Sequence, residues 1–120
     1  RRPREPRIWP YGSERRLVLH MMSRAMMLFE WDDEKSEATR HERGFGFEEV
    51  AGVFLDPARF VFPDNREDYG EERWTAFGLI EGRLFAVTDT RRGEVICIIP
   101  ARKANARERR RYDANKDLQA

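Results

Sequence analysis

Apolar residues in this chain never run for more than five positions, and one of these longest runs is VICII at 95–99. A transmembrane helix needs about 20 apolar residues in succession, so we expect no membrane span. Five apolar residues without polar alternation are typical of a strand that is covered on both faces. The run therefore predicts a central strand around which the remaining elements pack.

The 120 residues include eight Phe, three Trp and three Tyr, which is enough bulk for one modest core. A single cysteine excludes an internal disulfide framework and an all-cysteine metal site. The two histidines, His20 and His41, lie in separate segments, so we expect no metal site and no cofactor. No stretch has the length of a secretory signal, which favours a cytoplasmic location.

Charge is divided unevenly along the chain although the net charge is only +1. Residues 1–26 carry seven Arg and two Glu, residues 27–90 are net negative, and residues 91–120 carry nine basic and four acidic residues. A nearly neutral protein with this partition can still present one basic face to a polyanion. Residues 1–26 also contain three Pro and no hydrophobic period, so we expect a disordered or non-native leader before a domain at 27–120.

The first half of that domain predicts a strand and two helices. Alternating aromatic residues at 27–31 indicate a strand, and Asp32 has the position of a helix N-cap. The helix is expected to reach about residue 42, with Gly44 as its left-handed C-cap. A second helix is expected from Gly46 to Asp56, since apolar residues at 47, 50, 51 and 54 share one face.

The second half predicts an antiparallel meander and a final helix. Candidate strands lie at 59–62, 74–80, 83–90 and 95–99, with hairpin turns at 81–82 and 92–93. Asn105 and Glu108 have capping-box spacing, which predicts a helix running past Tyr112. The order β-α-α-β-β-β-β-α indicates an α+β domain with helices packed on an antiparallel sheet.

Common enzyme motifs are absent, and the notable chemistry is cationic. Arg91 and Arg102 each stand near the end of a predicted strand, and four arginines follow at 107 and 109–111. Arginine suits phosphodiesters because its planar guanidinium donates two parallel hydrogen bonds and stays charged. If the last two strands form a hairpin, however, Arg91 lies near its turn and Arg102 at the far end. The competing interpretation of the arginine run is a solvated helix face.

Five segments in order resemble the BrnT family, toxins of type II toxin–antitoxin pairs with a RelE-like fold. They are FEWD at 29–32 followed by Lys35, GFGFEEV at 44–50 with FLDP at 54–57, DNREDYGEER at 64–73, TDTRRGEVICII at 88–99, and PARKANARERRRYD at 100–113. The chain departs from the family pattern at several positions. Thr39 and Glu42-Arg43 replace the usual Asn and Lys-His, Cys97 replaces an Arg, and Pro100 replaces a Ser.

The resemblance implies a metal-independent endoribonuclease in which a ribose 2′-OH attacks the adjacent phosphate. It assigns Arg91 and Arg102 to phosphate binding and transition-state charge, and Lys35 to proton transfer or to a second cation. Supporting substrate contacts are expected from Arg107, Arg109 and Tyr112. The family histidine is lost, replaced by Arg43, or substituted by His41.

The resemblance also implies a partner, a BrnA-like ribbon-helix-helix antitoxin that masks the basic site. The expected assemblies are a dimer or a heterotetramer with the antitoxin. The toxin is expected to contact DNA only through the antitoxin. The competing hypothesis is a catalytically weak or inactive module that binds the antitoxin and acts as co-repressor, which the missing Lys-His pair favours. Direct DNA binding is disfavoured because the acidic central segment repels DNA.

Overall fold

The computed structural model describes residues 15–22, 25–64 and 70–119. Within these residues, six strands and four helical segments follow one another. They are β1 (Arg15–Met22), β2 (Ala25–Asp32), α1 (Asp33–Arg43), α2 (Phe47–Val50), the 3₁₀ helix η1 (Ala51–Leu55), β3 (Phe60–Pro63), β4 (Trp74–Ile80), β5 (Arg83–Arg92), β6 (Val95–Lys103) and α3 (Ala106–Gln119). Within these described residues, no helix is both long and apolar enough to cross a membrane.

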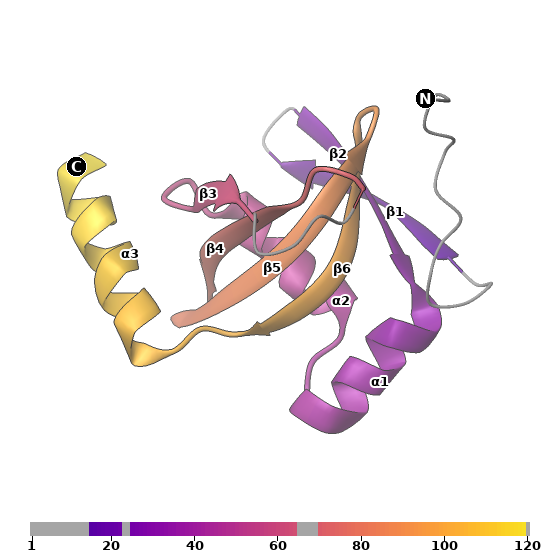
Figure 1. The fold of residues 1–120 in the computed structure, drawn as a ribbon, viewed down its shortest axis with the longest axis horizontal. Coiled ribbons are helices and arrows are strands. Elements are labelled where there is room, and N and C mark those ends of the chain that lie inside the picture. Colours follow the sequence, from indigo (N-terminus) through magenta and orange to yellow (C-terminus); the bar gives the residue numbers. More distant parts are fainter. Residues whose placement is uncertain (1–14, 23–24, 65–69, 120) are drawn as a thin grey trace.

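The strands form one sheet in the order β1-β2-β6-β5-β4-β3 (Figure 1). Counted from β2, the elements follow the predicted order β-α-α-β-β-β-β-α, so the α+β class is confirmed. The sheet is mostly antiparallel, as predicted, with one parallel pair between β2 and β6. The chain leaves β2 through α1 and returns to its side only after the meander, and such a crossover allows parallel pairing.

Strand β1 is the element that the sequence analysis did not predict. It pairs with β2 in an antiparallel register, with Val18 opposite Phe29 and His20 opposite Met27. The expected leader at 1–26 therefore includes a paired edge strand at 15–22, and residues 1–14 lie outside the described residues. Pairing satisfies the backbone groups on the side of β2 that faces away from β6.

The local signals at both ends of α1 are confirmed. The Asp32 side chain accepts hydrogen bonds from the backbone of Glu34 at 2.8 Å and of Lys35 at 3.4 Å. At the other end, Gly44 adopts a φ of 89°, a left-handed conformation that favours glycine. Asp32 is fully buried, so this cap also fixes the direction in which α1 leaves the sheet.

The predicted second helix is replaced by two short segments. The chain makes one turn of α-helix in α2 and then tightens into η1. In this tight winding Val53 is also fully buried, together with Phe54. Gly78 of β4 permits the approach, because a Cβ at Gly78 would stand 2.7 Å from the Val53 carbonyl oxygen.

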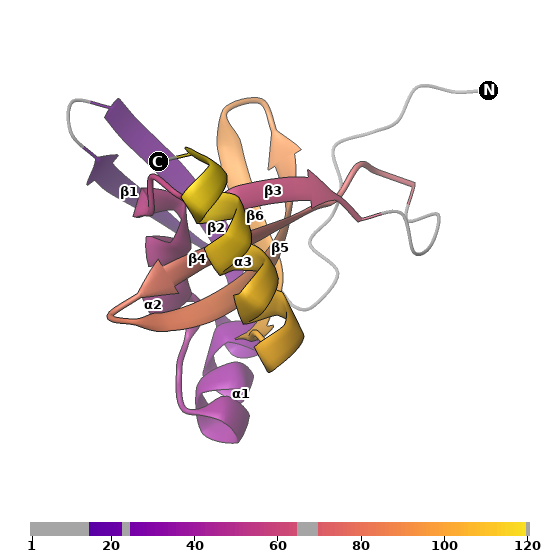
Figure 2. The same ribbon diagram turned by 90° about the vertical axis from the view of Figure 1, so that its left-hand side faces the viewer.

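The sheet separates two apolar clusters, as the alternation along β5 shows. Phe85 and Val87 pack on the face that carries α2 and η1, whereas Leu84 and Ala86 face α3. Figure 2 shows α3 lying across the sheet, near β3 and β4. Ten apolar residues of the predicted strands and helices are all buried: Phe29, Trp31, Phe47, Val50, Phe54, Phe77, Leu84, Val87, Ile96 and Ile98.

Strands β5 and β6 are longer than predicted, and this affects the site. The hairpin turn lies at Gly93 and Glu94, one residue later than expected, with Gly93 at a φ of 61°. The register shifts between Val87 and Asp89, so an irregularity of the ladder accommodates Pro100 within β6. Arg102 consequently lies within β6, opposite Ala86, instead of following the strand.

Candidate functional site

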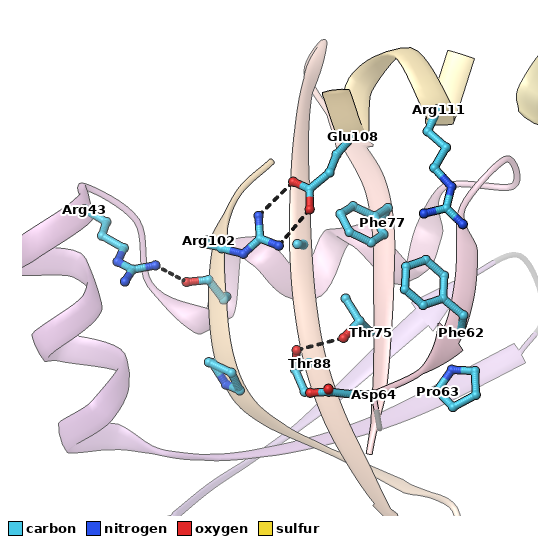
Figure 3. Close-up of a pocket in the computed structure, with 13 residues that line it drawn as sticks. Arg43, Phe62, Pro63, Asp64, Thr75, Phe77, Thr88, Arg102, Glu108 and Arg111 are labelled. Atoms are coloured by element: carbon cyan, nitrogen blue, oxygen red, sulfur yellow. Dashed lines mark hydrogen bonds and ion pairs between the residues drawn. The ribbon is translucent and has the colours of Figure 1, made fainter. Parts of the chain in front are cut away.

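A cavity of about 490 Å³ opens between the sheet, α3 and the C-terminal end of α1 (Figure 3). Its floor is formed by β4 and β5, through Thr75 and Phe77 and through Ala86 and Thr88. Phe62 and Pro63 of β3, with Asp64 after it, form one side. We refer to this cavity as the sheet pocket. Its size is within the range of small-molecule sites in proteins.

Three arginines reach the sheet pocket from three different elements. Arg43 is the last residue of α1, and its Nη1 donates a hydrogen bond to the Ala101 carbonyl oxygen at 3.1 Å. Arg102 comes from β6, and its side chain is 47% exposed. Arg111 comes from α3, with its Cζ atom 5.2 Å from the centre of the Phe62 ring. Cations that converge on one cleft from separate elements raise the positive potential there, which favours anionic ligands.

Arg102 is held by Glu108 in a bidentate pair. Its Nη1 and Nη2 each donate to one Glu108 carboxylate oxygen at 2.8 Å. Glu108 also accepts a hydrogen bond from the Asn105 backbone, and the Asn105 side chain accepts one from Glu108, which confirms the predicted capping box. The hydrogen bonds from Arg102 are the main cause that lowers the pKa of Glu108 below its ordinary value, while partial burial opposes them.

The remaining polar wall combines hydroxyls with a carboxylate. The Thr75 and Thr88 hydroxyls lie 3.1 Å apart and form a hydrogen bond across β4 and β5. Asp64 is only 8% exposed, and its backbone N–H donates to the Arg73 carbonyl oxygen at 2.8 Å. The pocket therefore offers cations, hydroxyls and two carboxylates beside an aromatic surface.

Of the predicted site residues, Arg102 and Arg43 meet in the sheet pocket, and Arg91 lies elsewhere. Arg91 pairs with Ile96 at the hairpin end of β6, six residues before Arg102. At about 3.3 Å per residue, that spacing is roughly 20 Å along the strand. The Arg91 side chain instead donates to Asp89 at 3.0 Å. The structure therefore does not bring the two predicted phosphate-binding arginines into one site.

The predicted residues on α1 do not line the sheet pocket. Lys35 lies in the first turn of α1, beside its N-cap, and is partly buried. His41 is exposed in the last turn, and only Arg43 of that turn reaches the pocket. Neither Lys35 nor His41 is therefore placed to transfer a proton there.

On α3 the predicted contacts Arg107 and Arg109 do not line the pocket. Arg107 is exposed on the first turn. Arg109 donates to the Gly82 carbonyl oxygen at 3.2 Å and to Asp113 at 3.2 Å, next to the β4–β5 turn. The residues that α3 contributes to the pocket are Glu108 and Arg111, three positions apart on one face.

Tyr112 is a buried residue of the core beneath α3. It is 1% exposed, and its hydroxyl donates to Asp56. Burial and this carboxylate raise the pKa of Tyr112 well above its ordinary value. Burial tends to raise the pKa of Asp56, but hydrogen bonds from Leu79, Tyr112 and Ala58 hold it below its ordinary value. These contacts attach α3 to the sheet, and Tyr112 does not line the pocket.

Cys97 does not have the properties of a reactive thiol. Burial, reinforced by Glu30, raises the pKa of Cys97 to about 12, so the thiol stays protonated. Within the described residues, no group of three or more His, Cys, Asp or Glu side chains is placed to hold a metal ion.

The sequence profile described as "Ribonuclease toxin, BrnT, of type II toxin-antitoxin system" matches residues 31–108. The chain belongs to the BrnT family. A search of curated proteins gives no significant match. Membership of a type II toxin family implies an RNA substrate and an antitoxin partner.

The match to the BrnT profile covers most of the sheet pocket and ends within it. It runs from the last two residues of β2 through β6 to Glu108 in the first turn of α3, and it does not include Arg111 or Tyr112. Two of the departures from the BrnT pattern, Arg43 and Pro100, line the pocket, and a third, Cys97, is buried in β6. The change at Arg43 therefore places a guanidinium at the site.

Proposed function

We propose that this chain is an endoribonuclease toxin that cuts RNA at the sheet pocket, with Arg102 as its principal phosphate-binding residue. The proposed chemistry is metal-independent attack of a ribose 2′-OH on the adjacent phosphate. One observation carries the proposal: three arginines from separate elements surround a cavity large enough for a nucleotide.

The arrangement meets two requirements of this reaction. The substrate must be held so that the 2′-oxygen lies in line with the leaving 5′-oxygen, which a rigid pocket wall favours. The charge that develops on the phosphorus oxygens must be stabilised by donors fixed in advance. Arg102 is fixed by β6 and by its bidentate pair, and Arg43 and Arg111 add charge at the same opening.

The pocket also supports contacts to a nucleobase. The Arg111 guanidinium lies over the Phe62 ring at one side of the cavity. Aromatic rings and guanidinium groups can both stack on bases. Thr75 and Thr88 supply hydroxyls along the floor. We therefore expect single-stranded RNA as the substrate, since only an unpaired nucleotide can enter such a cavity.

The partner proposed for this toxin is a BrnA-like ribbon-helix-helix antitoxin that covers the basic opening. Masking a cationic site requires a surface of complementary potential, so the covering segment should be acidic and apolar. DNA is then bound by the antitoxin within the complex.

Substitution of Arg102 tests the enzyme proposal. Arg102→Ala should lower RNA cleavage by about 10²–10³-fold, because a contact made mainly in the transition state is lost. Arg102→Lys should recover little of it, because lysine cannot reproduce the bidentate geometry. Arg110→Ala is the control, since Arg110 is exposed on α3 and does not line the pocket. Cleavage is measured on purified protein free of antitoxin, with and without ribosomes, and EDTA should not change it.

A second candidate function is an antitoxin-binding co-repressor with little or no catalysis. It is favoured by the position of Lys35 and His41, neither of which lines the pocket. Growth inhibition on induced expression distinguishes the two candidates. Equal activity of the Arg102→Ala and Arg110→Ala proteins, or no cleavage by the wild type, contradicts the enzyme proposal.

A further inference from the structure

The proposed reaction needs a group that takes the proton of the attacking 2′-OH. This inference rests on the proposed function and concerns the same pocket. Arg43, Arg102 and Arg111 stay protonated in proteins and cannot accept a proton. Among the described residues that line the sheet pocket, only Asp64 and Glu108 have carboxylate side chains that can accept a proton.

The position of Glu108 fits this task better than that of Asp64. Its two carboxylate oxygens lie 2.8 Å from the nitrogens of Arg102, the proposed phosphate-binding residue. The 2′-oxygen is attached next to the carbon that carries the scissile phosphate, so a base beside that phosphate is within reach of it. The Glu108 side chain is 21% exposed at the pocket, whereas Asp64 is 8% exposed.

The backbone also holds Glu108 in place. Its Oε1 accepts a hydrogen bond from the Asn105 backbone at 2.9 Å, and its own backbone N–H donates to Asn105 Oδ1 at 2.8 Å. A carboxylate fixed in a capping box at the start of α3 is already oriented before substrate binds, which favours catalysis over a freely rotating side chain.

We infer that Glu108 is the proton acceptor of the cleavage reaction, whereas the family resemblance implied Lys35 for proton transfer or as a second cation. As the 2′-oxygen forms its bond to phosphorus, its proton passes to the Glu108 carboxylate. The bond from phosphorus to the 5′-oxygen breaks, and that oxygen takes a proton from water. The products are a 2′,3′-cyclic phosphate and a 5′-hydroxyl, and Glu108 then returns its proton to water.

Phosphate binding itself makes Glu108 a stronger base. In the free protein, Arg102 holds the pKa of Glu108 below its ordinary value. A phosphate that takes hydrogen bonds from Arg102 weakens this effect and adds a negative charge beside the carboxylate, and both changes raise its pKa. The other charged groups around the pocket act in opposite directions: Arg43 and Arg111 favour the ionised form, and Asp64 disfavours it.

Glu108→Gln is the decisive variant because glutamine keeps the capping-box hydrogen bond but cannot accept the proton. We expect kcat to fall by about 10²–10⁴-fold, the usual contribution of general base catalysis. The acidic limb of the pH–rate profile, which reports ionisation of the base, should disappear. Binding of an RNA analogue with a 2′-deoxyribose at the cleavage site should not weaken, because a negative charge is removed from the pocket.

Glu49→Gln is a matched control. Glu49 also accepts a hydrogen bond in a capping box, from Gly46 at 2.8 Å, and also pairs with an arginine, Arg40. It lies on α2 and does not line the sheet pocket, so its substitution should leave cleavage and the pH profile unchanged.

Each outcome separates the inference from the proposed function. If Glu108→Gln cleaves as fast as Glu49→Gln, or faster than wild type, the inference is wrong while the proposed function stands. Loss of the acidic limb in Asp64→Asn but not in Glu108→Gln assigns the proton to Asp64 and also overturns the inference. If the wild-type protein cuts no RNA, the proposed function fails, and the inference fails with it.

Discussion

At the scale of single residues, the most informative side chains are buried polar groups with defined partners. Tyr112 was expected to contact substrate, and the structure instead places its hydroxyl on Asp56 under α3. A tyrosine can contact substrate or form a structural hydrogen bond in the core. The direction of its side chain on the helix decides between these two roles. Stability and activity should therefore respond differently to its substitution.

Tyr112→Phe should reduce stability without changing the chemistry. Removal of the hydroxyl takes one hydrogen bond from a partly buried carboxylate, which costs about 1–3 kcal/mol. Asp56 keeps its bonds from Leu79 at 2.8 Å and Ala58 at 2.8 Å, so the fold should survive. Urea denaturation measures the loss, and RNA cleavage per folded molecule should match wild type. Reduced cleavage at unchanged stability would instead indicate a substrate contact.

Asp89 should make folding depend on pH in a direction unusual for an acidic residue. It is fully buried in the sheet, and Oδ2 has no hydrogen-bond partner among the described residues. Burial raises the pKa of Asp89 from its ordinary 3.8 to about 6, although Arg91 opposes this. The folded state thus keeps a proton that the unfolded chain has already lost, so stability should fall as the pH rises from about 4 to about 6.

Asp89→Asn should remove this pH dependence. Because one pKa unit corresponds to about 1.4 kcal/mol, the free energy of unfolding of wild type relative to the variant should decline by roughly 2–3 kcal/mol across that window. Urea denaturation at several pH values gives this difference directly. Glu49, Asp56 and Glu108 have lowered pKa values and contribute the opposite slope at lower pH, in both proteins alike. A constant difference between the two proteins would show that Asp89 is ionised throughout.

At the scale of secondary-structure elements, β1 tests where the folded domain begins. It lies at one edge of the sheet and pairs only with β2 among the described strands. A chain that begins at residue 25 exposes the backbone edge of β2 along eight paired positions. We expect a lower melting temperature and more self-association, because an unpaired edge strand recruits other strands.

The control for this truncation begins at residue 15 and keeps β1 intact. Each kcal/mol lost lowers the melting temperature of a domain of this size by about 4–8 °C, so a loss of one or two is measurable by circular dichroism. The protein that begins at residue 15 should have a melting temperature close to that of the full chain. Equal melting of all three proteins would support the initial expectation that the folded domain begins after a leader at residues 1–26.

What could be predicted at this scale depended on local signals. The cap at Asp32, the left-handed Gly44 and the Asn105–Glu108 box each involve neighbours in sequence, and all are present. The turn at Glu81 and Gly82 is present too, with φ of 50° and 80°. The parallel β2–β6 pair and the register shift between Val87 and Asp89 depend on residues far apart along the chain, and nothing local specifies them.

The site residues also divide into those that could be predicted from local sequence and those that depend on the fold. Arg102 and Arg43 could be named from the motif because the family pattern includes those positions. Glu108 and Arg111 required the orientation of α3, and that helix has too few apolar residues to reveal its buried face, with Tyr112 as its main anchor. The three-residue spacing from Glu108 to Arg111 is the signal in the sequence that could have identified these two residues. It places both on one face of the helix, beside Tyr112.

At the scale of the whole molecule, the distribution of charge determines which surface a partner can cover. The chain is acidic in its middle and basic towards its C-terminal end, and the fold places arginines from both parts at one pocket opening. Arg43 comes from the acidic segment, so the basic surface is created by folding rather than by composition. An acidic antitoxin segment seated there would block the site and be attracted to it over a distance.

Charge reversal at Arg111 tests this arrangement. Arg111→Glu replaces attraction by repulsion at the pocket opening, so the affinity for the cognate antitoxin should fall, and most of its salt dependence should be lost. Arg83→Glu makes the same charge change at the exposed β4–β5 turn, outside the sheet pocket, and should have little effect. Isothermal titration at low and high salt compares the two variants with wild type. Equal losses in both would mean that the antitoxin responds to net charge alone, and unchanged binding of Arg111→Glu would place the interface elsewhere.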